Sequence, residues 1–231
     1  MPSITAAKDK YALLSFFDTI SIVNVTGSIS RSWSKAHDAL GGVADICATH
    51  NSDGVNFLPC GATQLSECLR CILVSYIDNL TRAFDSLLTV KPINIIIIID
   101  DRPEDDLEST IVECSRKLDD LRAPLHQVGI HLFQVGDDHE TAKMLRELYE
   151  KLNGSMKIRD MFGATAWDRS WPWRKKSLTS KCILDVVLGA VVRRLDHMKN
   201  GRLCTRLEQP CTSSVQPFVS ANSPFFGPEP V

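Results

Sequence analysis

The sequence predicts a three-layer α/β/α fold, in which helices cover both faces of a mostly parallel central sheet. Segments with strand and helix patterns alternate along the chain, which is the order that consecutive β-α-β units produce. Residues 95–99 are five consecutive isoleucines. An apolar run without alternation is typical of a central parallel strand that is buried on both faces.

In the first half of the chain, a strand is expected over residues 17–24, which are rich in β-branched side chains. Residues 30–32 can cap the helix that follows, where apolar residues recur at helical spacing up to Cys47. A turn at 51–54 leads to a short apolar segment, 55–58. A long helical pattern then runs from Leu65 to Leu80.

In the second half, the isoleucine segment 94–100 is the expected central strand. The acidic loop 101–106 is expected to cap the next helix, and a further strand is expected over 128–135. Asp137 and Asp138 open another helix. A last short strand at 158–162 and an apolar helix over 178–197 complete the prediction.

Length and composition are those of an ordinary globular protein. The chain has 231 residues, of which 44% are hydrophobic and 23% are charged, which is enough for a sizeable core. The net charge of -2 gives no electrostatic reason to expect nucleic-acid binding. The most apolar late stretch, 182–192, is too short to span a membrane, and no secretory signal is recognised. We therefore expect a cytoplasmic protein with neither a nucleic-acid nor a membrane partner.

The domain prediction follows from where the periodic patterns begin and end. We expect an N-terminal extension over 1–10, one domain over 11–200 and a flexible tail over 201–231. The tail is rich in Pro and Ser and has neither a helical nor a strand period.

The eight cysteines allow two interpretations. An even number suggests a disulfide framework, but the chain is long and shows no export signal, so we expect reduced thiols, several of them in the core. Cys68 and Cys71 form a lone CxxC within a helical pattern. Metal or redox chemistry is one reading of this pair, and two ordinary helix residues are the favoured one.

Polar residues stand where strands end. Asn24, Thr26 and Ser28 follow the first strand, Thr63 precedes the long helix, and Asp100 ends the central strand. Sites in parallel sheets form at the carboxyl ends of the strands, and oxygen donors suit Mg²⁺, Mn²⁺ or Ca²⁺. Such residues also commonly cap helices or satisfy loop backbone, so spacing alone leaves both readings open.

Several segments carry a family resemblance. They are 17–20 (FDTI), 24–28 (NVTGS), 91–100 (KPINIIIIID), 119–134 (DDLRAPLHQVGIHLFQ) and the helix at 181–196. In order and in residues they are similar to segments of the intracellular von Willebrand factor A-like proteins of fungi. The likeness covers about residues 11 to 198.

The resemblance implies a Rossmann-like von Willebrand A fold with a divalent ion above the sheet, in a metal-ion-dependent adhesion site. Its ligands would be Asn24, Thr26, Ser28, Thr63 and Asp100. The ion, Mg²⁺ or Mn²⁺, would leave one position open for an Asp or Glu carboxylate of a partner protein. The implied function is protein binding without catalysis.

Three departures from the family pattern predict a degenerate site. Asn24 replaces an Asp, which removes a negative charge that a hard cation would use. Asp101 replaces a Gly, either as a compensating charge or as an exposed loop acid. Only Pro59 and Cys60 remain where the family has a longer segment holding an edge strand and a helix, which predicts a sheet shortened at one edge and a displaced Thr63.

Two other functions are weighed against this one. A magnesium-dependent phosphatase or phosphotransferase could use Asp100 and Asp101, although their spacing differs from that of known paired-aspartate enzymes. A scaffold that keeps the fold but binds no metal is the third reading. His126 and His131 are expected to be packed or surface residues. Three tryptophans among basic residues at 167–176 are expected to lie against the sheet, although they could also stack on a partner.

Overall fold

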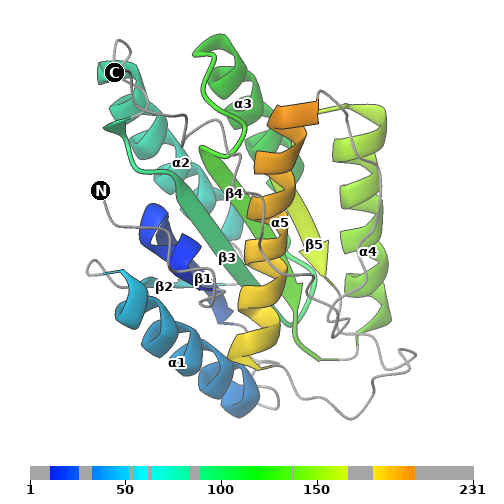
Figure 1. Ribbon diagram of the computed structural model, residues 1–231. Helices are drawn as coiled ribbons and strands as arrows, with labels where there is room; N and C mark the ends of the chain where they lie inside the picture. Colours follow the sequence, from blue (N-terminus) through cyan, green and yellow to red (C-terminus); the bar gives the residue numbers. More distant parts are fainter. Residues whose placement is uncertain are drawn as a thin grey trace.

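The expected three-layer α/β/α arrangement is confirmed in a computed structural model, which describes residues 11–25, 33–51, 55–61, 64–83, 89–136, 138–165 and 179–200. Within these ranges, a five-stranded sheet lies between two layers of helices (Figure 1). The expected N-terminal extension, the expected tail and the tryptophan-rich segment lie outside the described residues.

The helices and strands alternate along the chain, as the sequence pattern predicts. In chain order they are η1 (Ala12–Phe16), β1 (Asp18–Val25), α1 (Trp33–His50), β2 (Val55–Gly61), α2 (Leu65–Arg82), β3 (Ile93–Ile99), α3 (Leu107–Asp120), β4 (Val128–Gln134), α4 (His139–Glu150), the π-helical turn η4 (Lys151–Ser155), β5 (Phe162–Thr165) and α5 (Ser180–Asn200).

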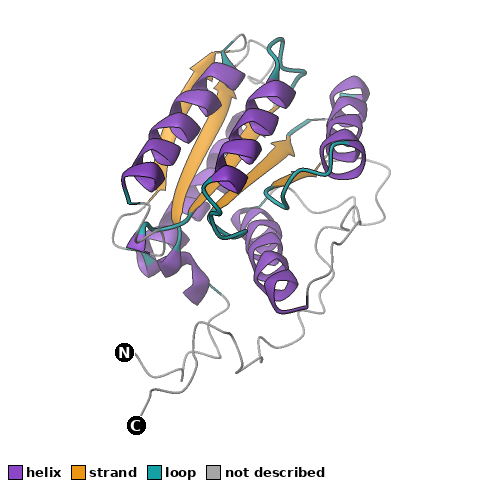
Figure 2. Ribbon diagram, turned by 90° about the horizontal axis from the view of Figure 1, so that it is seen from above, coloured by secondary structure: helices purple, strands orange, loops and turns teal. Residues whose placement is uncertain are grey.

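The strands lie in the order β2-β1-β3-β4-β5, and all four neighbouring pairs are parallel. Every residue of β3 is buried, which confirms the prediction of a central strand covered on both faces. Side chains alternate between the two faces of a strand. Ile95, Ile97 and Ile99 therefore pack with α2, α3 and α4, whereas Ile96 and Ile98 pack with α1 and α5. Figure 2 shows these two helix layers on opposite faces of the sheet.

Two acidic residues begin helices, as the sequence suggests. The Asp106 carboxylate accepts a hydrogen bond from the backbone N–H of Ser109 at 3.0 Å, and Asp138 accepts one from Thr141 N–H at 2.8 Å. Hydroxyl and backbone hydrogen bonds to the ionised form lower the pKa of both carboxyls. These caps explain why α3 and α4 begin where they do.

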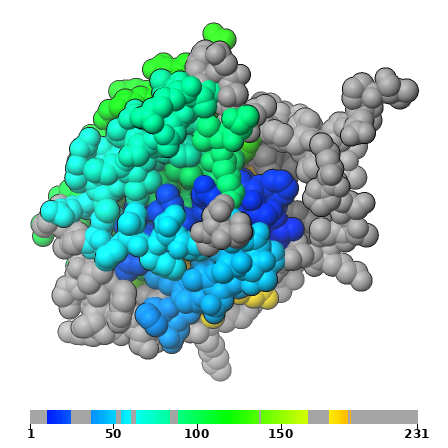
Figure 3. Space-filling view, turned by 90° about the vertical axis from the view of Figure 1, so that its left-hand side faces the viewer, coloured from blue at the N-terminus to red at the C-terminus, as the bar shows by residue number. Residues whose placement is uncertain are grey.

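The sheet is open at β2. In the described part of the chain β2 pairs with β1 alone, and two of its large apolar side chains, Phe57 and Leu58, are 42% and 37% exposed. In Figure 3 the cyan atoms of this region reach the surface between α1 and α2. The strand is also longer than the apolar segment 55–58 suggests, because it continues through Pro59 and Cys60 to Gly61.

The prediction of a last strand at 158–162 is wrong, because β5 begins only at Phe162 and ends at Thr165. Gly163 lies beneath the imidazole of His131, and a Cβ atom there would come within 2.5 Å of Nδ1. His131 Nε2 is 2.9 Å from the Thr165 hydroxyl. The His131 ring fills the space that a side chain at position 163 would occupy. This explains why β5 contains a glycine, although glycine has a weak strand propensity. His126 and His131 are both buried, in agreement with their expected packing role.

No helix in the described ranges is both long and apolar enough to cross a membrane.

Candidate functional site

The candidate site is the edge where the carboxyl ends of β1, β2 and β3 meet. Val25 of β1 lies opposite Gly61 of β2, and Val23 lies opposite Ile98 of β3. The loops that leave these three strands therefore begin side by side. This is the edge at which parallel sheets place their binding sites.

Asn24 is the central residue of this edge. It lies opposite Cys60 in the β1–β2 pair, and the alternation along β1 places it on the same face as Ile22, towards α2 and α3. Its side chain is fully buried at 0% exposure. Neither Oδ1 nor Nδ2 of Asn24 has a hydrogen-bond partner among the described residues. Buried amides are nearly always paired, so this one points to a missing partner.

Asp100 is the carboxylate of the site. It follows Ile99 at the end of β3, next to the end of β1, and it is 8% exposed. Its neighbour Asp101 is only half-buried. The adjacent strands β1 and β3 therefore each end in a buried side chain that carries an oxygen donor.

The loop after β3 reaches across to the start of α2. The backbone N–H of Ser66, in the first turn of α2, donates a hydrogen bond to Oδ2 of Asp105, which is 39 residues away in sequence. The second carboxylate oxygen of Asp105, Oδ1, is buried and has no partner among the described residues. The N-terminus of α2 carries a partial positive charge, which favours a carboxylate at this position.

Asp105 is the residue that sequence reasoning missed. The acidic loop is expected to cap only the following helix, and Asp106 does so at α3. Asp105 instead caps α2, so the loop joins two helix N-termini. The two adjacent acids, Asp105 and Asp106, are the sequence signal that could have suggested one cap for α2 and another for α3.

Two of the five predicted ligands, Asn24 and Asp100, lie at the carboxyl ends of the adjacent strands β1 and β3. The other three, Thr26, Ser28 and Thr63, lie outside the described residues. Thr63 immediately precedes the segment that enters α2, whose first turn contacts Asp105. The loops that carry the predicted ligands therefore all start from the same side of the sheet.

The described residues contain no group of three or more His, Cys, Asp or Glu side chains that could hold a metal ion. The candidate oxygen donors are the Asn24 amide and the Asp100 carboxylate at the strand ends, and the Asp105 carboxylate in the loop that follows β3. Oxygen donors of this kind fit a hard cation such as Mg²⁺ or Mn²⁺. The unpartnered Oδ1 atoms of Asn24 and Asp105 are the observations that favour such an occupant.

A disulfide lies beside this edge, which corrects the expectation of reduced thiols. Cys60, opposite Asn24 in β2, is bonded to Cys68 in α2. The expectation holds for Cys47 and Cys114, which are free and buried in the core. Burial raises the pKa of both thiols, to about 11 for Cys114. The sequence spacing of the cysteines could not reveal this disulfide, because the bond depends on how closely β2 approaches α2.

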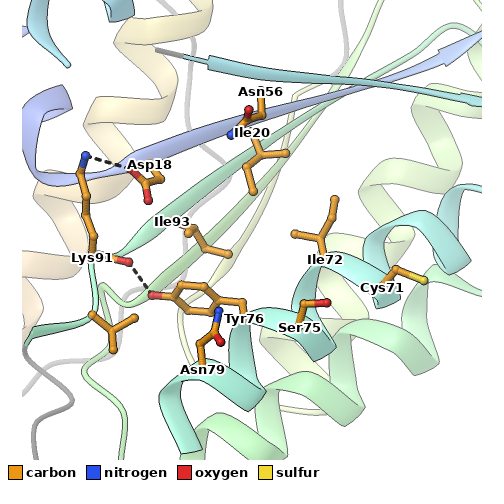
Figure 4. Close-up of a pocket in the computed structure, with 11 residues that line it drawn as sticks. Asp18, Ile20, Asn56, Cys71, Ile72, Ser75, Tyr76, Asn79, Lys91 and Ile93 are labelled. Carbon is orange, nitrogen blue, oxygen red and sulfur yellow. Dashed lines mark hydrogen bonds and ion pairs between the residues drawn. The ribbon is translucent and has the colours of Figure 1, made fainter. Parts of the chain in front are cut away.

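A pocket of about 570 Å³ opens at the opposite end of the sheet, between α2 and the start of β1 (Figure 4). Lys91 Nζ pairs with Asp18 at 2.8 Å on one side of it. The Tyr76 hydroxyl donates to Lys91 O at 2.8 Å, and burial raises the pKa of this phenol. These contacts join α2 to the segment before β3, which is a structural role.

Comparison with known proteins adds no family assignment. No family model, curated protein or solved structure matches this chain.

Proposed function

We propose that this protein is a non-enzymatic interaction module of the von Willebrand A type, with a weakened metal-ion-dependent adhesion site at the carboxyl ends of β1 and β3. The observation that carries the proposal is the buried, unpartnered side-chain amide of Asn24. The resemblance of segments 17–28 and 91–100 to that family supplies the expected metal chemistry.

The energetics of Asn24 support a ligand at this position. Leaving a buried polar group without a hydrogen bond costs about 1–3 kcal/mol. A leucine or valine on β1 would avoid this cost, as Ile22 does two residues earlier on the same face. A cation that binds the Oδ1 lone pair would recover the part of this cost that belongs to the oxygen, and Nδ2 would still need an acceptor. The native amide is therefore easier to explain by binding than by folding.

The charge at the site supports a weak rather than a tight interaction. Asn24 offers a carbonyl oxygen without a negative charge, so Asp100 supplies the charge on the strand ends. Asp105 is a further carboxylate in the loop that follows β3, and one of its oxygens is already used by Ser66 N–H. Affinity for a hard dication increases with the number of charged ligands.

The bound ion would supply one open coordination position for a carboxylate of another protein. The residues of this chain would hold the ion and orient that position towards solvent at the sheet edge. We expect Mg²⁺ or Mn²⁺, and a partner that presents an Asp or Glu side chain. No catalytic group is required for this role.

Thermal unfolding of the wild type and of Asn24→Asp, first with chelator and then with excess Mg²⁺ or Mn²⁺, tests the metal step. At a hundredfold excess over Kd, binding stabilises the folded state by about 2.7 kcal/mol, or roughly 5–11 °C for a domain of this size. We expect a small shift for the wild type and a larger one for Asn24→Asp. Asp100→Asn is the matched control, because it removes the charge without changing the size and should abolish the shift. Equal midpoints with and without metal for both the wild type and Asn24→Asp would refute metal binding at this edge.

Retention on immobilised carboxylates tests the partner step. We expect the Asn24→Asp protein to bind a surface that presents Asp side chains when Mg²⁺ is present and to elute with chelator. A surface that presents Asn is the control, since it matches Asp in size but lacks the charge. Metal-independent retention, or equal retention on both surfaces, would contradict a metal-bridged carboxylate.

A further inference from the structure

Three cysteines lie in β2 and the first half of α2. Cys60, in β2, is 5% exposed and is bonded to Cys68, in the second turn of α2. Cys71 follows one turn later on α2 and is an exposed, free thiol. The Cys68 sulfur therefore belongs to a disulfide while a third cysteine lies within one helical turn of it.

Helix geometry places Cys71 within reach of Cys68. Residues three apart on a helix have Cβ atoms about 5–6 Å apart, and a disulfide needs about 3.5–4.5 Å. Closing this difference needs a local adjustment of the helix backbone, because rotation about χ1 moves the sulfur but not Cβ. Cys68 is partly buried against the core and Cys71 is exposed, so an attacking thiol can approach from the solvent side.

The surroundings of Cys71 are open and polar. The thiol is one of the groups that line the 570 Å³ pocket, and Figure 4 shows it on the outer side of α2. Cys71 Sγ donates to Glu67 Oε1 at 3.5 Å. The same carboxylate pairs with Arg70 through bonds of 2.7 and 2.5 Å. Rotation of Cys71 towards Cys68 therefore breaks one weak hydrogen bond and leaves the ion pair in place.

We propose that Cys60, Cys68 and Cys71 form a thiol–disulfide exchange site, in which the bond from Cys60 to Cys68 is replaced by a bond from Cys68 to Cys71. The Cys71 thiolate attacks Sγ of Cys68. The Cys71–Cys68 bond forms as the Cys60–Cys68 bond breaks, and the electron pair leaves with the Cys60 sulfur. Cys60 then takes up a proton in place of the one that Cys71 released, so no external oxidant or reductant is consumed.

The exchange changes which elements are covalently joined. Before it, the disulfide links β2 to α2 across the connection that contains Thr63. After it, the bond lies within α2 alone, and the end of β2 is held only by the sheet and the core. The three cysteines thus control a covalent tie between the open edge of the sheet and the helix above it.

Peptide mapping without reduction distinguishes the two bonds. Trypsin cleaves after Lys35, Arg70 and Arg82, so Cys60 and Cys68 fall in peptide 36–70 and Cys71 falls in peptide 71–82. The full-length protein, purified without reductant, is incubated in mildly alkaline buffer with a trace of monothiol, then alkylated in acid and digested. Fragmentation of any linked pair shows which cysteines are joined.

We expect the 36–70/71–82 pair, joined through Cys68, to appear while alkylation of Cys71 falls and alkylation of Cys60 rises by the same amount. Cys71→Ser, an exposed and conservative change, should keep the internal Cys60–Cys68 bond and give no linked pair. The proposal is overturned if Cys71 stays fully alkylated throughout, or if the pair is joined through Cys60 or Cys47. It is also overturned if the starting protein has no Cys60–Cys68 bond.

Discussion

Replacing Asn24 by leucine should stabilise the metal-free protein, although it removes a polar residue from the candidate site. Leucine resembles asparagine in shape, with two methyl groups in place of Oδ1 and Nδ2. Both of those atoms are buried and unpartnered among the described residues. Removing this unpaired amide should recover about 1–3 kcal/mol. At roughly 2–4 °C per kcal/mol, the unfolding midpoint in chelator should rise by about 2–12 °C.

Asn51 provides a matched control for this experiment. It is also buried, at 6% exposure, but both of its amide atoms are used. Nδ2 donates to Phe17 O at 3.1 Å, and Oδ1 accepts from Lys91 Nζ at 3.0 Å. Asn51→Leu removes both hydrogen bonds, although Lys91 keeps its ion pair with Asp18, and should destabilise the protein by about 1–3 kcal/mol. The same substitution at two buried sites should therefore have opposite signs.

Urea and thermal unfolding in chelator, followed by addition of Mg²⁺, measure both effects. We expect Asn24→Leu to raise the midpoint in chelator and to lose any shift caused by the metal. If Asn24→Leu lowers stability as much as Asn51→Leu does, the Asn24 amide is already satisfied in the folded protein. The main support for a cation at this edge would then be lost.

Three further outcomes are expected. Asp138→Ala should cost about 0.5–2 kcal/mol at neutral pH, because it removes an N-cap. The pKa of the Asp138 carboxyl is lowered in the folded state, so its contribution to stability is present above the ordinary Asp range and is lost on acidification. The free energies of unfolding of the variant and the wild type, measured with urea, should therefore converge at low pH. Gly163→Ala should cost about 1–3 kcal/mol through its contact with His131, and a double-mutant cycle with His131→Ala should show that the two changes are coupled. Glu67→Gln should speed disulfide exchange a few-fold by weakening the hydrogen bond that holds the attacking thiol, and time-resolved peptide mapping would reveal an unchanged rate if this reasoning is wrong.

The sequence predicted the central elements because their patterns are governed by burial. The five isoleucines of β3 could be accommodated only where both faces of the sheet are covered, and the structure confirms this. The sequence pattern predicts β5 too early, at 158–162, because Gly163 and Ala164 carry little strand signal. Their conformation is decided by the His131 ring on the neighbouring strand, which is tertiary information.

The sequence likewise predicts only part of the candidate site. Parallel strands end at one edge, so the position of Asn24 and Asp100 at the same edge of the sheet follows from the predicted topology. The contact between Asp105 and Ser66 does not, because these residues are 39 positions apart and meet only when α2 and α3 pack side by side. The Cys60–Cys68 bond likewise depends on the distance between a strand and a helix.

The open edge of the sheet has a consequence for how the protein behaves at high concentration. An outer strand with unpaired backbone groups is a template for any extended segment, and exposed apolar side chains such as Phe57 make it an attractive one. Pro59 lies within the same strand and has no backbone N–H to donate. A segment of another chain that pairs with β2 therefore lacks one backbone hydrogen bond at Pro59. This single residue helps to protect the open edge of the sheet from aggregation.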